Sequence, residues 1–303
     1  MNGILILDKP SGLTSTKVVN KVKKLMGMKK AGHTGTLDPF ATGVLPICFN
    51  QATKAIPYLK EDFKEYEAEM IIGITTDTMD STGKIISEKK TDILNNSEIE
   101  EVLKSFCGEQ NQVPPMFSAV RVGGVRLYKL ARKGKEVERK PRKIFIEEIE
   151  LLEYDHPVIR YKVKCSKGTY VRVLACEIGK RLGYGGHLKN LIRLSSGKFK
   201  LEDATNIEDI EKGNYKLLTL KEVLSENKNI EVENELAEKI MTGMQLTKLN
   251  LDKIKLPNFK KEDIITIHFN ERVISICKAL IDKNRFEYAL DEDIIFQHLR
   301  VFN

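Results

Sequence analysis

One carboxylate in a loop rich in glycine and threonine is the feature of this sequence best suited to chemistry. The loop covers residues 32–46, GHTGTLDPFATGVLP, and Asp38 is its only acid. It contains no lysine, so it lacks the pattern of a phosphate-binding P-loop. Enzymes that form an aspartyl phosphate place the nucleophilic Asp before a similar Thr-Gly-Thr stretch, whereas Asp38 follows one. Spacing therefore disfavours phosphoryl transfer and leaves two interpretations, a tight surface turn or a site whose chemistry depends on Asp38.

Positive charge is concentrated in one later segment. Between Arg121 and Lys143 the chain carries ten basic and two acidic residues, a net charge of +8 that exceeds the +7 of the whole chain. Apolar residues such as Leu127 and Leu130 interrupt the charges, and Gly123-Gly124 lies among them. The pattern predicts a hinged, partly helical arm that meets a polyanion.

Hydrophobic periodicity around these two segments predicts both strands and helices. Strands are expected over residues 4–7, 66–72 and 159–165, and helices over 14–26, 97–106 and 173–182. The second helix opens on a capping box formed by Ser97 and Glu100. Because the strands alternate in polarity, we expect an α/β (α+β) fold with a mixed, largely antiparallel sheet and helices. Beyond a polar linker near 225–229, apolar runs at 264–269, 273–279 and 286–290 predict a small β domain.

Length and composition bound the class of protein. The 303 residues, 41% apolar and 31% charged, suffice for about two domains and a sizeable core. No stretch approaches 18 apolar residues, and the first apolar run is too short for a signal peptide. Five cysteines and five histidines are scattered without metal-ligand spacing. We therefore expect a cytoplasmic protein that neither binds a metal nor enters a membrane.

Residues 32–46 resemble, position by position, the active-site motif of the TruB family of tRNA pseudouridine synthases. Other stretches agree in order and spacing: GILILDKPSG at 3–12, KEY at 64–66, GITTDTMD at 73–80, PPMFSA at 114–119 and CSKGTYVR at 165–172. The resemblance covers about residues 3–200. It implies a catalytic domain over residues 1–228, with an RNA-gripping arm at about 115–143. Residues 229–303 resemble, by position, the small PUA-like β-barrel of such enzymes.

The resemblance also implies a reaction and its catalytic residues. The family isomerises uridine 55 in the T loop of tRNA to pseudouridine, which involves no redox change and needs no cofactor. It implies that Asp38 is the nucleophile and that Arg172 pairs with it and favours its charged form. Tyr66 is implied to stack on the target uracil and is a candidate for proton transfer. Whether Asp38 attacks C1′ of the ribose or C6 of the base stays open.

Further residues are implied to bind RNA. His33 matches the residue that fills the stack vacated by the flipped base, Tyr170 matches a second ring of the pocket, and Leu191 matches an apolar wall. The other expected RNA contacts are Lys9, Arg121, Arg126, Lys129 and Arg132. Two departures weaken parts of this match. Ile192 stands where relatives often carry arginine, and residues 231–303 hold 11 basic and 13 acidic side chains, a net charge of −2.

We therefore expect a stand-alone enzyme that acts on the T arm of tRNA as a monomer, without an obligatory protein partner. Two alternatives remain open. The first is an RNA-folding chaperone whose main contribution is binding. The second is the RNA-guided synthase scaffold that shares this catalytic domain and requires a guide RNA and protein partners.

Overall fold

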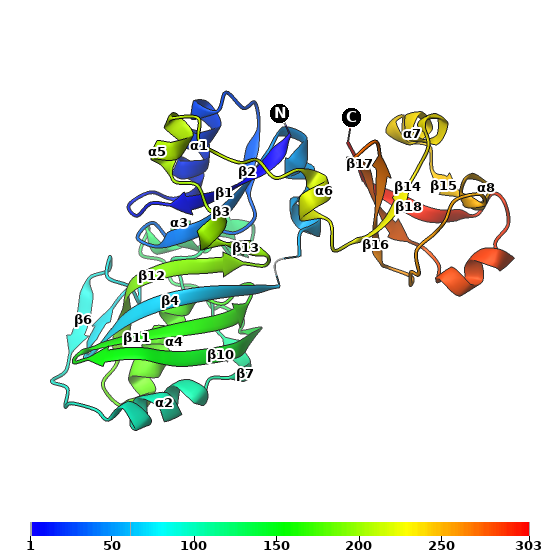
Figure 1. Cartoon of the computed structure of the whole chain (residues 1–303). Coiled ribbons are helices and arrows are strands. Elements are labelled where there is room, and N and C mark those ends of the chain that lie inside the picture. Colours follow the sequence, from blue (N-terminus) through cyan, green and yellow to red (C-terminus); the bar gives the residue numbers. More distant parts are fainter. Residues whose placement is uncertain (1, 61, 303) are drawn as a thin grey trace.

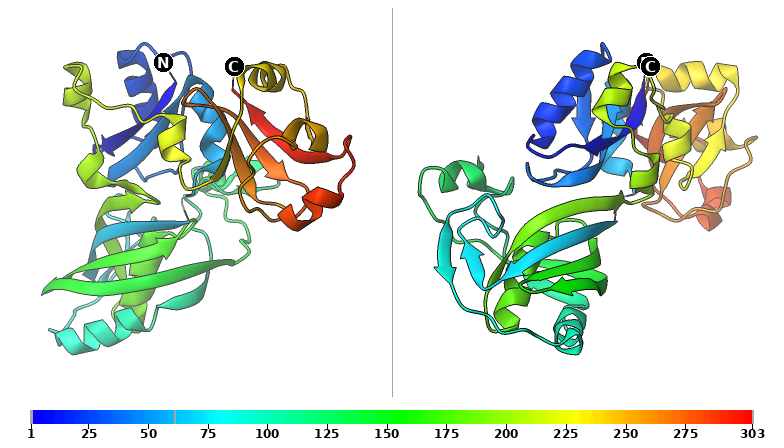
Figure 2. Two further views of the ribbon diagram at one scale, coloured as in Figure 1. Left: turned by 45° about the vertical axis from the view of Figure 1, so that its right-hand side comes forward. Right: turned by 60° about the vertical axis from the view of Figure 1, so that its left-hand side comes forward.

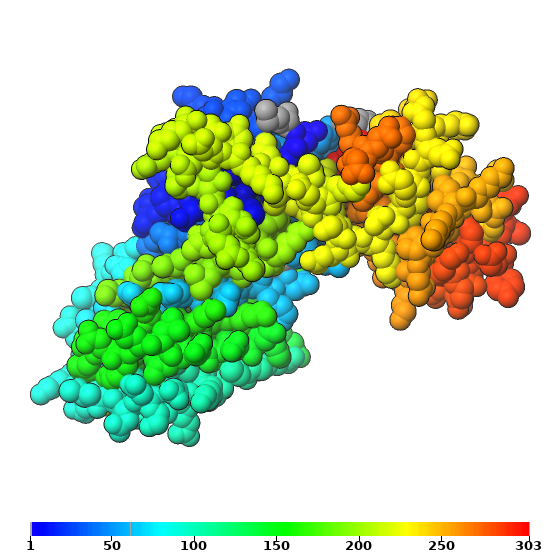
Figure 3. Space-filling model, viewed as in Figure 1, coloured from blue at the N-terminus to red at the C-terminus, as the bar shows by residue number. Residues whose placement is uncertain are grey.

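The computed structural model describes residues 2–60 and 62–302 of the chain. Figure 1 shows a long twisted sheet, with the N-terminal strands at its upper end, and a smaller domain to one side. In the space-filling view of Figure 3, the residues coloured yellow to red form a separate lobe beside the rest. No helix among the described residues is long and apolar enough to cross a bilayer.

Nine strands form the main sheet, which follows the path β1-β3-β12-β4-β11-β10-β7, with β2 paired to β3 and β13 paired to β12. Their bounds are β1 (Gly3–Lys9), β2 (Ala31–His33), β3 (Thr42–Phe49), β4 (Phe63–Ile72), β7 (Gly108–Gln112), β10 (Arg142–Asp155), β11 (Val158–Ser166), β12 (Gly186–Ser196) and β13 (Phe199–Lys200). These pairings are antiparallel except that of β12 with β3. The predicted α+β fold with a mixed, largely antiparallel sheet is confirmed.

Helices cover this sheet through the apolar faces that their sequences predicted. Helix α1 (Ser15–Leu25) begins after Thr14, whose side chain caps Lys17 N, and packs Val18 and Val22 against β1 and β3. Helices α2 (Asn96–Lys104) and α4 (Val171–Arg181) pack against β4, β10, β11 and β12. The predicted capping box of Ser97 and Glu100 is wrong, because α2 already begins at Asn96 and its N-cap, Asn95, makes no side-chain bond.

Five strands form the second sheet, in the order β14-β16-β17-β18-β15. Their bounds are β14 (Lys228–Glu231), β15 (Leu246–Thr247), β16 (Ile264–Phe269), β17 (Arg272–Ala279) and β18 (Ile294–Val301), with helices α7 (Asn234–Met241) and α8 (Lys248–Leu251) beside them. The strands predicted at 264–269 and 273–279 are confirmed. The one predicted at 286–290 is wrong, because Lys283–Tyr288 form a 3-10 helix. Phe286 is buried, whereas Tyr288 and Leu290, which would share its face of a strand, are exposed.

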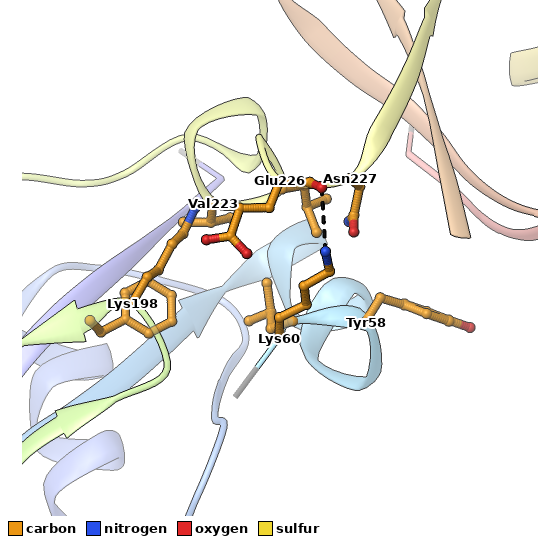
Figure 4. Close-up of a pocket in the computed structure, with 9 residues that line it drawn as sticks. Tyr58, Lys60, Lys198, Val223, Glu226 and Asn227 are labelled. Carbon is orange, nitrogen blue, oxygen red and sulfur yellow. Dashed lines mark hydrogen bonds between the residues drawn. The ribbon is translucent and has the colours of Figure 1, made fainter. Parts of the chain in front are cut away.

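The curled second sheet is of the PUA-like kind, and it packs against the main sheet. Val273, Ile276 and Phe302 join a buried apolar cluster with Ile4 and Val44 of β1 and β3. Figure 4 shows a hollow at this junction with the side chains of Lys198, Val223 and Asn227 around it, and there Lys60 Nζ donates to Glu226 O at 3.3 Å. None of the predicted catalytic or RNA-binding residues lines the hollow. The domain boundary at 228/229 stays a prediction.

Gly43 provides a test of how tightly β3 and β12 are held together. Its φ is +96°, and a Cβ at this position would collide with the backbone of Arg193 in β12. Gly213 has a φ of +81° and open space around it. We expect Gly213→Ala to lower the free energy of unfolding by about 1 kcal/mol, the conformational cost alone. Gly43→Ala should lower it by more than about 3 kcal/mol, because backbone must also move. Urea unfolding measures both, and equal losses would contradict the close contact.

Candidate active site

Asp38 lies in the loop that joins β2 to β3, and hydrogen bonds from α1 hold this loop in place. Ser15 Oγ of α1 accepts a hydrogen bond from Leu37 N at 2.9 Å and donates to Leu37 O at 3.0 Å. Ala41 N donates to Asp38 O at 3.2 Å, which closes the turn. The Asp38 side chain keeps 31% of its surface exposed. The loop is therefore a hydrogen-bonded turn that leaves its one carboxylate accessible, as the first interpretation of the sequence expects, and a chemical role for Asp38 stays a prediction.

Lys9 supports the same loop from the end of β1. Its side chain is fully buried, and Nζ donates to Ala41 O at 2.7 Å, Pro10 O at 2.9 Å and Pro39 O at 3.1 Å. Burial lowers the pKa of Lys9 to about 8, while the nearby carboxylate of Asp38 raises it. This geometry favours a role in holding the loop over the predicted contact with RNA.

Arg172 connects the loop to two other segments. It lies in the first turn of α4 with 4% of its surface exposed. Its Nε lies 3.5 Å from Asp38 Oδ2, Nη1 lies 3.4 Å from Asp80 Oδ2, and Nη2 donates to Phe117 O at 2.6 Å. Nε is buried and makes no hydrogen bond of good geometry, so its contact with Asp38 is an ion pair without a formed hydrogen bond. The structure thus brings the expected nucleophile and its expected partner together.

Asp80 is part of this group, and the sequence did not reveal it. It lies between β5 (Ile74–Thr76) and β6 (Ile85–Glu88), and Oδ1 accepts hydrogen bonds from Thr78 Oγ1, Thr82 N and Thr82 Oγ1. Its other oxygen, Oδ2, faces Arg172. Asp80 therefore caps its own turn and also orients the arginine. The neighbouring Asp77 only caps the turn, since Oδ1 accepts from Lys84 N at 2.8 Å.

Tyr66 and Leu191 lie side by side on the face of the sheet that carries the site. Tyr66 of β4 is opposite Arg193 of β12 in the antiparallel register, and Leu191 is opposite Ala68. Tyr66 and Leu191 are 7% and 5% exposed and belong to the same apolar cluster as Leu37 of the catalytic loop. Burial raises the pKa of the Tyr66 phenol, and the guanidinium of Arg193 opposes that rise.

His33 and Tyr170 lie at the edges of the group. His33 ends β2, and burial lowers its pKa with further lowering by Arg193 and Lys64, so the imidazole is neutral at pH 7. Tyr170 is the N-cap of α4, and its ring lies 5.8 Å from the Arg172 guanidinium. Gln112 of β7 fixes its backbone, accepting from Tyr170 N at 2.8 Å and donating to Tyr170 O at 3.1 Å.

The basic arm begins at the site and extends away from it. Arg121, Arg126, Lys129 and Arg132 are all exposed, on strands β8 (Arg121–Val122) and β9 (Val125–Arg126) and on helix α3 (Leu127–Ala131) and its C-terminal end. In the right-hand view of Figure 2, the α3 segment stands out from the body between the blue N-terminal elements and the cyan β5–β6 hairpin. Gly123 and Gly124, with φ of +55° and +80°, form the turn of the β8–β9 hairpin and not a hinge.

The electrostatic setting of Asp38 has opposing parts. Burial raises the pKa of its carboxyl, Arg172 lowers it, Asp80 raises it and Lys9 lowers it. The net direction is upward, so burial outweighs the two cations. Among the described residues, no group of three or more His, Cys, Asp and Glu side chains is placed to hold a metal ion.

Three residues of the site were missed at the sequence level. Arg193 could have been found from its spacing, because positions 191 and 193 of a strand share a face and Leu191 was already placed there. Asp80 carried the weaker signal of an acid in the GITTDTMD turn. Gln112 carried none, since its contact with Tyr170 joins residues 58 positions apart.

Comparison with known proteins matches this arrangement to one family. Residues 23–171 match the family model described as TruB family pseudouridylate synthase (N terminal domain). The tRNA pseudouridine synthase B of Clostridium kluyveri is 45% identical over 305 aligned positions, covering 100% of both chains. That of Clostridium tetani is 40% identical over 278 positions, 91% of this chain and 95% of the relative. Among solved structures, a crystal structure of a Cbf5-Nop10-Gar1 complex has a similar chain, with a TM-score of 0.74, 26% identity and coverage of 99% of this chain and 85% of that one.

The fold and the site thus define an enzyme of uridine isomerisation. The chain belongs to the TruB family of pseudouridylate synthases.

The raised pKa of Asp38 predicts a stability difference with a defined sign. The pKa of the Asp38 carboxyl is higher in the folded protein than in the unfolded chain, where it is about 3.9. Its contribution to the free energy of unfolding is therefore fully present below the unfolded pKa and is lost as the pH rises through the folded pKa. We therefore expect Asp38→Asn to be more stable than wild type at pH 7, by about 1 kcal/mol. The difference should shrink as the pH falls toward about 4. Urea unfolding at both pH values measures it, and a less stable variant at pH 7 would mean that Arg172 outweighs burial.

Proposed function

We propose that this protein isomerises uridine 55 in the T loop of tRNA to pseudouridine, by flipping the base out of the loop and attacking with Asp38. The observation that carries the proposal is the ion pair of Asp38 with the buried Arg172 beside Tyr66, in a loop whose carboxylate stays accessible. Relatives at 40% and 45% identity over nearly their whole length are named tRNA pseudouridine synthase B, which supports tRNA as the substrate.

Each residue around Asp38 has a role in this proposal. Arg172 favours the ionised form of Asp38 against the effect of burial and aims it, and Tyr66 stacks on the uracil and takes part in proton transfer. His33 fills the gap left by the flipped base, a role that suits a neutral imidazole because it can stack without a charge to solvate. Tyr170 and Leu191 form the remaining walls of the pocket.

The exposed basic residues of the arm are proposed to hold the T arm through its phosphates. Such contacts position an RNA without reading its sequence, so recognition of the loop falls to the residues around Asp38. The Arg172 bond to Phe117 O ties the base of the arm to the catalytic group.

We propose that the protein acts as a monomer without an obligatory protein partner, and that residues 229–303 form the second domain.

The first prediction from this proposal concerns the nucleophile. Asp38→Asn should lower the release of tritium from C5 of uridine in T-arm RNA by more than about a thousandfold, because the amide cannot form the covalent intermediate. Asp77→Asn is the matched control, since Asp77 caps the neighbouring turn and makes no contact with Arg172. If Asp38→Asn retains full turnover, the assignment of the nucleophile is wrong.

The same assay separates the two alternatives. Turnover of a bare T-arm hairpin by the purified chain is expected and excludes a dependence on guide RNA and protein partners. An RNA chaperone predicts that Asp38→Asn preserves the cellular role while loss of the basic arm abolishes it. The stand-alone enzyme predicts that both changes reduce pseudouridine at position 55, which sequencing of cellular tRNA can measure.

A second prediction concerns the arm. Arg126→Gln and Lys129→Gln should each weaken the binding of T-arm RNA. The slope of the logarithm of the binding constant against the logarithm of the salt concentration should become shallower by about 0.7 to 0.9 for each phosphate that the variant no longer neutralises. Lys253→Gln, in the second domain, is the control because that domain carries no positive surplus. Binding titrations at three salt concentrations measure the slopes, and unchanged slopes in both arm variants would contradict the proposed binding of phosphates by the arm.

A further inference from the structure

Arg193 is a buried cation that the roles above do not use. It is 0% exposed, and no carboxylate pairs with it in the part of the chain that the structure describes. A buried charge without an opposite charge is costly, so its surroundings must stabilise it or use it. Nε donates to Val44 O at 2.7 Å and Nη2 donates to Gly35 O at 3.3 Å. These bonds attach the guanidinium to both ends of the catalytic loop.

The third nitrogen of the guanidinium has no such acceptor. Nη1 is buried and has no hydrogen-bond partner of good geometry. It lies 3.6 Å from the position that a Cβ of Gly35 would occupy, so a side chain at residue 35 would crowd it. A buried N–H group of a cation is a strong hydrogen-bond donor, and leaving it without an acceptor costs free energy.

The side chain opposite Arg193 can supply that acceptor. Tyr66 is its direct partner in the antiparallel register of β4 and β12, and both side chains point to the buried face of the sheet. The guanidinium lies near enough to the Tyr66 phenol to lower its pKa. Because a phenolate accepts a hydrogen bond more strongly than a phenol does, this contact strengthens when Tyr66 loses its proton.

We propose that Arg193 is a positioning residue for Tyr66, whose hydroxyl it orients and whose phenolate it stabilises during the isomerisation. This inference rests on the proposed role of Tyr66 in proton transfer. Isomerisation moves C1′ from N1 to C5 of uracil, after which C5 must lose its proton and N1 must gain one. The Tyr66 phenolate takes the C5 proton, the electron pair of that C–H bond restores the C5–C6 double bond, and the electron pair of the C6–N1 double bond moves to N1, which takes a proton from water. The hydroxide that remains takes the proton of the Tyr66 phenol and restores the phenolate, so the step balances without an oxidant or reductant.

Other charged groups around Tyr66 act in the opposite direction or at longer range. Cys165 of β11 and Asp38 of the catalytic loop both raise the pKa of Tyr66, as burial does. Proximity to Arg193 lowers the pKa of Lys9 and of His33, and neither residue is among the groups that shift the pKa of Tyr66. Arg193 is thus the cation that directly favours the phenolate, and its effect on the pKa of Tyr66 is downward.

The direct test is the ionisation of Tyr66 in the protein without RNA. The chain has nine tyrosines and no tryptophan, so tyrosine labelled with ¹³C at Cζ can be titrated by NMR, and the Tyr66 signal can be assigned with Tyr66→Phe. We expect the pKa of Tyr66 to be higher in Arg193→Gln than in wild type, and intermediate in Arg193→Lys, which keeps the charge but donates fewer bonds. Lys189→Gln is the control, because Lys189 lies on the same strand and pairs with Glu69 outside the site. A folded Arg193→Gln whose Tyr66 titrates as in wild type overturns the proposal.

Kinetics separate this role from a purely structural one. Arg193→Gln should slow single turnover of T-arm RNA by about tenfold to a hundredfold and increase the isotope effect with deuterium at C5, since proton removal becomes slower. In the Tyr66→Phe background, the same substitution should have little further effect. An equal loss in both backgrounds overturns the proposal. Should Arg193→Gln not fold, Arg193→Lys takes its place, with an upward shift expected and no shift contradicting the role.

The two proposals fail in different ways. If the pKa of Tyr66 rises in Arg193→Gln but the wild-type protein does not modify T-arm RNA, the proposed substrate is wrong and the role of Arg193 is supported. If the wild-type protein modifies T-arm RNA but the pKa of Tyr66 is the same in Arg193→Gln, the role of Arg193 is wrong and the proposed substrate is supported.

Discussion

One buried guanidinium joins the candidate nucleophile to two other segments of the chain. Arg172 meets the catalytic loop at Asp38, the β5–β6 turn at Asp80 and the base of the arm at Phe117 O. A guanidinium is planar and its N–H groups have fixed directions, so three segments that bond to one arginine are also fixed relative to one another. The arm and the candidate nucleophile therefore share one anchor, and α4 holds that anchor in the core.

The site combines two acids with three largely buried cations, Lys9, Arg172 and Arg193. This surplus of positive charge suits a substrate that is a polyanion and a reaction in which negative charge develops on the base. It also explains why the cations differ in their partners. Arg172 is paired with carboxylates, whereas Lys9 and Arg193 are held by backbone carbonyl groups and keep their charge available to the site.

The sequence predicted the elements whose signals are local. Strands around residues 4–7, 66–72 and 159–165 and three helices follow from periodicity, and the residues of the loop follow from a motif. The misses have physical reasons. The run at 286–290 has the composition of a strand, but its packing buries only Phe286 and it forms a helical turn. Gln112 and Asp80 meet their partners 58 and 92 positions away along the chain, and no local pattern encodes such pairings. Arg193 was within reach, because strand alternation puts it on the same face as Leu191, which the resemblance had already placed in the site.

The apolar cluster between the two sheets has a consequence for how the chain matures. Val44 and Cys48 of β3, the strand that follows the catalytic loop, complete their packing only with Val273, Ile276 and Phe302. Those residues are synthesised after every strand of the main sheet, and Lys54 Nζ donates to Val301 O at 3.0 Å. This side of β3 therefore cannot complete its packing until residues 273–302 have been synthesised, and a nascent chain that stops before them leaves it exposed to water.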